Sequence, residues 1–135
     1  MRDINQIIVH CSATRPSMDI GSETIKKWHT IDNGWSDIGY HHVIRRDGTL
    51  DKGRDEEIAG AHARGHNGNS IGVCLVGGIN DAGEPDANFT LQQYLQLDNL
   101  ITAIKQRHNI TSVIGHRDVS DKACPSFDVQ LLLCS

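Results

Sequence analysis

Short apolar runs recur along the chain, separated by longer polar or amphipathic stretches. Three of these runs are aliphatic, rich in β-branched residues and too short for a helix, which favours buried β-strands. They cover residues 6–11, 71–76 and 113–114. Two further segments flank Asp47-Gly48, a dipeptide typical of tight hairpin turns. They cover residues 40–46 and 49–52, which we expect to pair as antiparallel strands.

Two longer segments carry apolar residues at helical spacing. The first covers residues 23–33, with Ser22 as a suitable N-cap. Its inner side would carry Ile25, Trp28 and Ile31. The second begins with a capping box formed by Thr90 and Gln93 and continues to about His108.

The order of these elements predicts the fold class. A short terminal helix over residues 128–134 completes the order β-α-β-β-β-α-β-α, which indicates a single α/β domain spanning residues 1–135. The run 71–76 is apolar on both faces of the expected strand, as is typical of a central strand covered on each side. We therefore expect a mixed central β-sheet flanked by helices on both faces.

The composition argues against several classes of partner. The chain has 135 residues and a formal net charge of -4, and its basic residues are scattered. Because phosphate binding needs a basic face, we expect no nucleic-acid partner. No apolar run approaches the roughly 20 residues that span a bilayer, so we expect no membrane association. We expect the protein to act as a monomer.

The N-terminus lacks the apolar core and cleavage site of a signal peptide. We therefore expect synthesis in the cytoplasm, with any action outside the cell depending on another route. Because no export signal is seen, we also expect no disulfides among Cys11, Cys74, Cys124 and Cys134. Only Cys124 has polar neighbours suited to chemistry, and no two cysteines show the C-x2-C spacing of a structural zinc finger.

The best candidate for chemistry is the stretch 113–124. His116 and Cys124 stand on either side of a short polar loop, and imidazole nitrogen and thiolate sulfur both suit zinc. A third ligand must come from far away in the chain, and His10, near the end of the run 6–11, is the best donor. Three protein ligands would leave a fourth position for water and suit amide hydrolysis. Each of the three residues, taken alone, also fits an ordinary buried side chain.

Several neighbouring polar residues have more than one interpretation. Lys122 is either a solvated loop charge or a group that stabilises an oxyanion. Tyr40 is either a half-buried strand aromatic or a group that orients water or bonds the scissile carbonyl. Asp118 caps the loop, pairs with a basic neighbour or supports a zinc-binding histidine. His62 is either a surface residue or part of a groove wall.

The polar, glycine-rich connection 53–70 shows no periodicity and is long for a compact domain, which is typical of a functional loop. It contains His62, His66 and Asn67. The other histidines and the two tryptophans are interpreted as structural, packing or surface residues. Those read as structural or packing residues are His41, His42, Trp28 and Trp35. Those read as surface residues are His29, His66 and His108.

Four ordered segments carry a more specific pattern. They are Val9-His10-Cys11-Ser12-Ala13-Thr14, Gly39-Tyr40-His41-His42, residues 69–78 and Lys122-Ala123-Cys124-Pro125-Ser126-Phe127-Asp128. Together they closely resemble the type 2 family of zinc N-acetylmuramoyl-L-alanine amidases, and in particular the short phage lysozymes of amidase type. The animal peptidoglycan-recognition proteins share the fold. The resemblance runs from about residue 5 to about residue 130.

The resemblance implies a site and a reaction. The zinc ligands would be His10, His116 and Cys124, and the catalytic side chains would be Tyr40 and Lys122. His62 and Asn67, in the groove-lining loop, are expected to contact substrate. The implied reaction is hydrolysis of the amide between the lactyl group of N-acetylmuramic acid and the L-alanine of the peptidoglycan stem peptide, which lyses the cell wall.

Two other readings remain open. A non-catalytic module that binds muropeptides without cutting them would lack the cysteine ligand in this family, whereas Cys124 is present. A purely structural zinc protein would need a fourth protein ligand, for which Cys134 is the spare candidate. The delivery route is also open, because a phage or prophage enzyme released by a pore and a secreted effector both fit an absent signal peptide.

Overall fold

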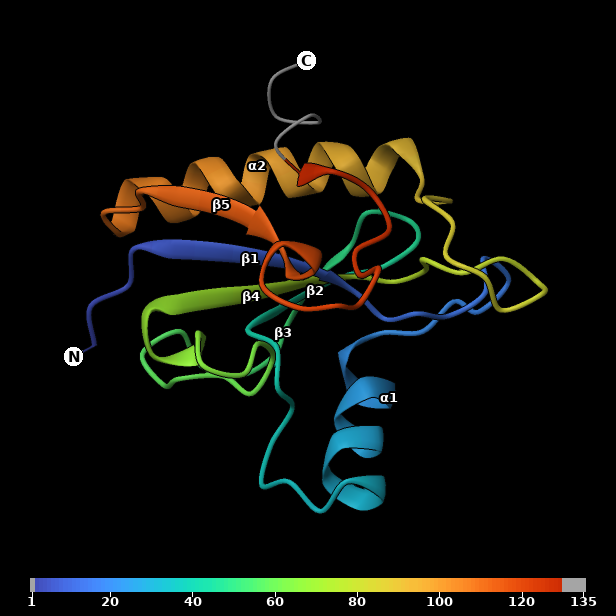
Figure 1. The fold of residues 1–135 in the computed structure, drawn as a ribbon, viewed down its shortest axis with the longest axis horizontal. Helices are drawn as coiled ribbons and strands as arrows, with labels where there is room; N and C mark the ends of the chain where they lie inside the picture. The colour runs from blue at the N-terminus through green and yellow to red at the C-terminus, as the bar shows by residue number, and fades with distance from the viewer. Residues whose placement is uncertain (1, 130–135) are drawn as a thin grey trace.

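The structure is a computed structural model, and it describes residues 2–129. Its centre is a five-stranded sheet with strand order β3-β2-β4-β1-β5 (Figure 1). The strands are β1 (Gln6–Cys11), β2 (His42–Ile44), β3 (Leu50–Lys52), β4 (Ser70–Leu75) and β5 (Ser112–Gly115). Strands β2, β4, β1 and β5 run parallel, and β3 pairs antiparallel with β2 through the predicted hairpin. The mixed α/β sheet expected from the sequence is therefore confirmed.

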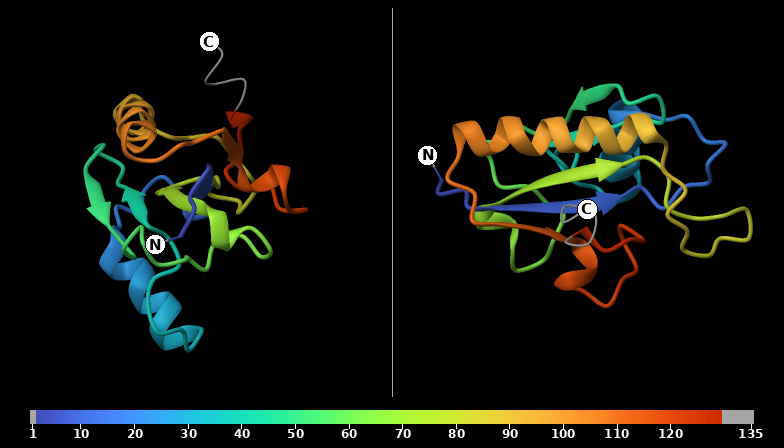
Figure 2. Two further views of the ribbon diagram at one scale, coloured as in Figure 1. Left: turned by 90° about the vertical axis from the view of Figure 1, so that its left-hand side faces the viewer. Right: turned by 90° about the horizontal axis from the view of Figure 1, so that it is seen from above.

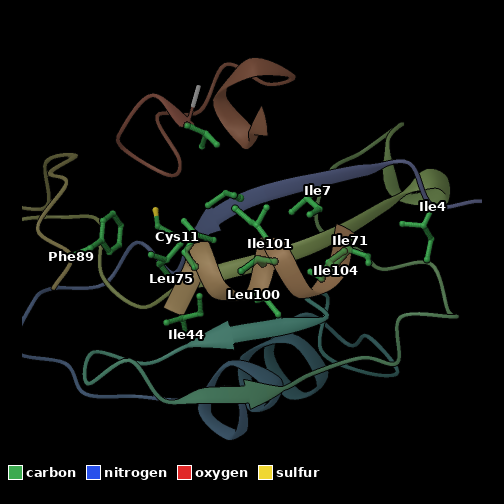
Figure 3. Close-up of a cluster of buried hydrophobic side chains, with 14 residues drawn as sticks. Ile4, Ile7, Cys11, Ile44, Ile71, Leu75, Phe89, Leu100, Ile101 and Ile104 are labelled. Atoms are coloured by element: carbon green, nitrogen blue, oxygen red, sulfur yellow. The ribbon is translucent and has the colours of Figure 1, made fainter. Parts of the chain in front are cut away.

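One face of the sheet packs against α2 (Leu91–Arg107). Alternate residues of β1 and β4 point toward this helix, which is the side-chain period of a strand. The cluster drawn in Figure 3 includes Ile7, Ile71, Leu75, Leu100, Ile101 and Ile104. The predicted capping box begins the helix: the Gln93 amide donates to Thr90 Oγ1 at 3.1 Å, and the Thr90 amide donates to Gln93 Oε1 at 2.9 Å. Figure 2 shows α2 lying over the sheet.

The opposite face packs against α1 (Ser22–Lys27) and the π-helical turn η1 (Trp28–Asp32). Ile25 joins Val43, Cys74 and Val76 in a second buried cluster on this side. Helices thus cover both faces, as the two-sided apolar run in β4 predicted. Val76 extends that apolar pattern one residue beyond the end of β4.

Two predicted helix details are wrong. Gly21, rather than Ser22, is the N-cap of α1. Ile31 was expected on the inner side but is 74% exposed. The Asn33 amide bonds the Trp28 carbonyl, five residues back, at 3.2 Å, and this wider π turn breaks the regular helical phase on which the prediction relied.

The strand expected over residues 40–46 is shorter in the structure, with β2 limited to His42–Ile44. At its far end Arg45 already belongs to the turn, because its carbonyl accepts from the Gly48 amide at 2.9 Å. The predicted terminal helix over residues 128–134 lies outside the described residues beyond Val129. Within the described residues, no helix has both the length and the apolar character needed to cross a membrane.

The sheet order explains where chemistry can be built. Strands β1 and β5 are parallel neighbours, so their carboxyl ends lie at the same edge of the sheet. Polar side chains at the ends of adjacent parallel strands converge at that edge. His10 lies one residue before the end of β1, and His116 follows β5 directly.

Candidate metal centre

The structure brings His10, His116 and Cys124 together. One possible ligand atom from each residue lies within 4.8 Å of the others, and the two imidazole ring centroids are 4.5 Å apart. His10 is 1% exposed, whereas His116 and Cys124 are half-buried. One side of the cluster is therefore closed by protein and the other side is more open.

Cys124 is held against the end of β1 by the backbone. The Cys11 amide donates to Cys124 Sγ at 3.0 Å, and the Arg117 amide donates to the Cys124 carbonyl at 2.6 Å, which closes the loop between these residues. Hydrogen bonding to the Cys11 thiol, together with burial, raises the pKa of the Cys124 thiol. A divalent cation at this position would therefore displace the thiol proton when it binds.

The two histidines of the cluster favour their neutral forms. Burial lowers the pKa of His10 well below its ordinary value, with further lowering from His62 and His116. Burial and then the nearby Lys122 ammonium lower the pKa of His116. Neutral imidazole is the form that binds a metal ion, so both rings are available as ligands at neutral pH.

Tyr40 and Lys122 lie close to this cluster. The Tyr40 ring centroid is 5.1 Å from that of His10, and burial raises the pKa of the phenol well above its ordinary value. Tyr40 therefore remains a protonated hydrogen-bond donor at neutral pH. Lys122 is exposed in the loop after β5, and its charge lowers the pKa of both His10 and His116.

A groove of about 840 Å³ opens beside the cluster, at His116. Its walls include His116, Lys122, His62 and Asn67, which are four of the residues expected at the site. Trp35 also lines the groove and is 41% exposed, although the sequence suggested only a packing role. The loop position of Trp35 carried no signal that distinguished the two roles.

His62 and Asn67 are engaged within the protein. His62 is 8% exposed, and its Nδ1 lies 2.8 Å from His10 Nε2. Asn67 Oδ1 accepts from the amides of His62 and Ala63 at 2.9 and 3.0 Å. Their predicted contact with substrate remains a prediction.

Other residues have defined structural contacts. The Gly72 amide donates to His41 Nδ1 at 3.0 Å, in keeping with a structural role for that histidine. Asp118 Oδ2 accepts from the Gly115 amide at 2.9 Å, which is the loop-capping alternative. His29, His66 and His108 differ from their expected surface placement, and His66 is half-buried with its carbonyl accepting from Ser70 Oγ at 2.6 Å. His29 and His108 have side-chain contacts. Both are half-buried, with His29 Nδ1 accepting from the Gly39 amide at 2.8 Å and His108 Nε2 lying 3.0 Å from Glu56.

Two imidazoles and a thiol, with the His116 imidazole lining an open groove, are a donor set that fits a zinc ion with a position left for water or substrate. The α/β fold and the candidate site together indicate a hydrolytic enzyme. Residues 1–127 match the family model described as N-acetylmuramoyl-L-alanine amidase, and the chain belongs to that family.

Individual relatives agree with this assignment. The endolysin of Klebsiella phage KP32 is 48% identical over 129 residues, which are 96% of this chain and 85% of the relative. The N-acetylmuramoyl-L-alanine amidase LysC from Clostridium intestinale URNW has a similar structure, with a TM-score of 0.85 and 31% identity over 98% of this chain and 85% of LysC. Drosophila PGRP-LB has a TM-score of 0.77 and 27% identity over 93% of this chain and 76% of its own.

Proposed function

We propose that this protein is a zinc-dependent amidase that cleaves the bond between N-acetylmuramic acid and L-alanine in peptidoglycan and thereby lyses the cell wall. The observation that carries the proposal is the convergence of His10, His116 and Cys124 next to a groove that His116 lines. Family membership supplies the reaction class, and the endolysin relatives support the cell wall as the place of action.

The donor set fits zinc better than a hard cation such as magnesium. Imidazole nitrogen and thiolate sulfur are preferred zinc ligands, whereas magnesium prefers oxygen. The Cys11 amide bonded to Cys124 Sγ would stabilise the thiolate needed for such a site. Zinc held by these three residues would polarise the scissile carbonyl and lower the pKa of water toward about 7.

Lys122 and Tyr40 would donate hydrogen bonds during the reaction. The exposed Lys122 ammonium lines the groove, where it can donate to the oxyanion that develops on the amide carbonyl. Tyr40 stays protonated because burial raises its pKa, so its role is to donate a hydrogen bond that orients the carbonyl or the attacking water. A phenol in this state does not serve as the general base at neutral pH.

The substrate and setting follow from the same proposal. The partner is peptidoglycan, with its muramyl peptides lying in the groove, and His62 and Asn67 belong to the wall of that groove. We propose a monomer that requires no nucleic-acid or membrane partner. We propose synthesis inside the cell and release to the wall by a separate route, and the endolysin relatives support the cell wall as the place of action.

Mass spectrometry of products from defined muropeptides tests the proposal. With zinc present, we expect release of free stem peptides that begin with L-alanine, and we expect a strong chelator to abolish this release. Binding of muropeptides without cleavage would instead support the recognition-module alternative, for which the similarity to PGRP-LB is the reason to include a binding assay. Cleavage that persists in full after the metal is removed would refute the zinc-dependent mechanism.

A further inference from the structure

His62 lies beside the candidate metal ligands, and its imidazole packs over β4. A Cβ added at Gly72 would come within 2.5 Å of His62 Cγ, so the glycine provides the space that this ring fills. The backbone amide of His62 is anchored by Asn67 Oδ1 at 2.9 Å. The ring therefore packs against the sheet, and the backbone of His62 is fixed by a hydrogen bond within its own loop.

The hydroxyl of Ser70 determines which nitrogen of His62 carries the proton. Ser70 Oγ lies 2.6 Å from the His66 carbonyl, which can only accept, so the single hydroxyl proton is donated there. The same oxygen lies 3.3 Å from His62 Nε2 and must accept in that contact. His62 Nε2 therefore carries the proton, and in the neutral ring Nδ1 is left with its lone pair.

The tautomer of His62 in turn determines the tautomer of His10. His62 Nδ1, which bears no proton, lies 2.8 Å from His10 Nε2, so His10 must donate from Nε2. A neutral His10 then has its lone pair on Nδ1. The two ring planes are nearly perpendicular, at 89°, with centroids 4.9 Å apart. Because the two nitrogens are only 2.8 Å apart, the rings meet edge to edge, as an N–H directed at an in-plane lone pair requires.

We infer that His62 is a positioning residue that, with Ser70, holds His10 in the tautomer whose Nδ1 is free to bind the metal ion. Such partners of ligating histidines fix the ring orientation and increase ligand basicity. Because both ring nitrogens of His62 are used inside the protein, its part in the site is support of His10 rather than a hydrogen bond to substrate. This inference rests on the zinc site of the proposed function and adds a specific role within it.

Zinc affinity of two variants at one position tests the inference. His62→Phe keeps a planar ring but removes the acceptor, whereas His62→Asn places Oδ1 where Nδ1 was and keeps the acceptor. Competition with a chromophoric chelator should show zinc binding weakened by about 10–100-fold in His62→Phe and changed by less than about fivefold in His62→Asn. Unchanged affinity in His62→Phe, or equal weakening in both variants, would overturn the inference.

Nitrogen NMR of the unaltered, metal-free protein provides a second test that does not depend on how the variants fold. Long-range correlations in the labelled imidazoles should show His10 and His62 each protonated at Nε2 and bare at Nδ1. Ser70→Ala should allow the other His62 tautomer to appear. A His10 ring protonated at Nδ1 in the unaltered protein would overturn the inference.

The proposed function and the role of His62 can be refuted separately. If the unaltered protein shows these tautomers and binds zinc but does not cut muropeptides, the proposed function is wrong and the role of His62 stands. If it binds zinc and cuts muropeptides while His62→Phe binds zinc equally well, only the positioning role is wrong.

Discussion

Neutralising Glu56 should destabilise the fold, because this half-buried carboxylate joins the 53–69 loop to β2 and to the end of α2. Its oxygens accept from Arg107 Nε at 2.9 Å and contact His108 Nε2 at 3.0 Å, and a third contact comes from His42. Burial alone would raise the pKa of Glu56, yet hydrogen bonds from Arg107, His42 and His108 hold it well below its ordinary value. The folded protein therefore stabilises the ionised form.

The size of the effect follows from how well each contact is shielded. A hydrogen bond to a charged group contributes about 1.5–3 kcal/mol, and an exposed ion pair about 0–1 kcal/mol. The His42 and His108 side chains are 12% and 15% exposed, whereas Arg107 is 43% exposed and contributes at the low end. We therefore expect Glu56→Gln to lower the free energy of unfolding at neutral pH by about 2–4 kcal/mol. For a chain of this length that lowers Tm by about 6–15 °C.

Urea unfolding of Glu56→Gln and of the unaltered protein, at neutral and acidic pH, measures this effect. Because the pKa of Glu56 is lower in the folded than in the unfolded chain, its contribution is complete above about pH 4.5 and is lost as pH falls through the folded-state value. The difference between the two proteins should therefore shrink in acid. Glu57→Gln, at an exposed neighbour, should be nearly neutral. Equal stability of Glu56→Gln and Glu57→Gln at neutral pH would show that the Glu56 carboxylate does not stabilise the fold.

Three further substitutions test the catalytic assignments on muropeptides. Lys122→Met should lower kcat by about 10–100-fold, less than for a buried oxyanion donor because Lys122 is exposed, while Lys105→Met on α2 should have no effect. Tyr40→Phe should lower kcat by about 10²-fold with zinc content unchanged, and Tyr94→Phe should retain activity. Cys124→Ser should weaken zinc binding by about tenfold or more, since a neutral hydroxyl replaces a thiolate. Full activity in Lys122→Met or Tyr40→Phe, or undiminished zinc affinity in Cys124→Ser, would remove that residue from the assigned role.

Local patterns predicted much of the fold. The continuous apolar runs of β1 and β4, and the capping box that begins α2, depend on neighbouring residues alone, so the sequence located them closely. The π turn after α1 was not predictable in this way. The wider turn over Trp28–Asp32 departs from regular helical spacing. Ile31 is therefore exposed, although regular spacing placed it on the inner side.

The site was predictable in composition but not in detail. Residue chemistry suggested His10, His116 and Cys124, yet their meeting depends on β1 and β5 being neighbours, which is a non-local property of the sheet. The resemblance to a known family implied that the three residues bind one metal ion. The contact between the His10 and His62 imidazoles had no sequence signal, because it depends on the loop folding back over Gly72.

X-ray absorption at the zinc edge of the metal-loaded protein identifies the atoms that bind the ion. We predict a first shell of two imidazole nitrogens at about 2.0–2.1 Å, one sulfur at about 2.3 Å and one further light atom. The sulfur shell should disappear in Cys124→Ser. A spectrum without sulfur in the unaltered protein, or with a shell of oxygen ligands alone, would contradict a zinc centre built from His10, His116 and Cys124.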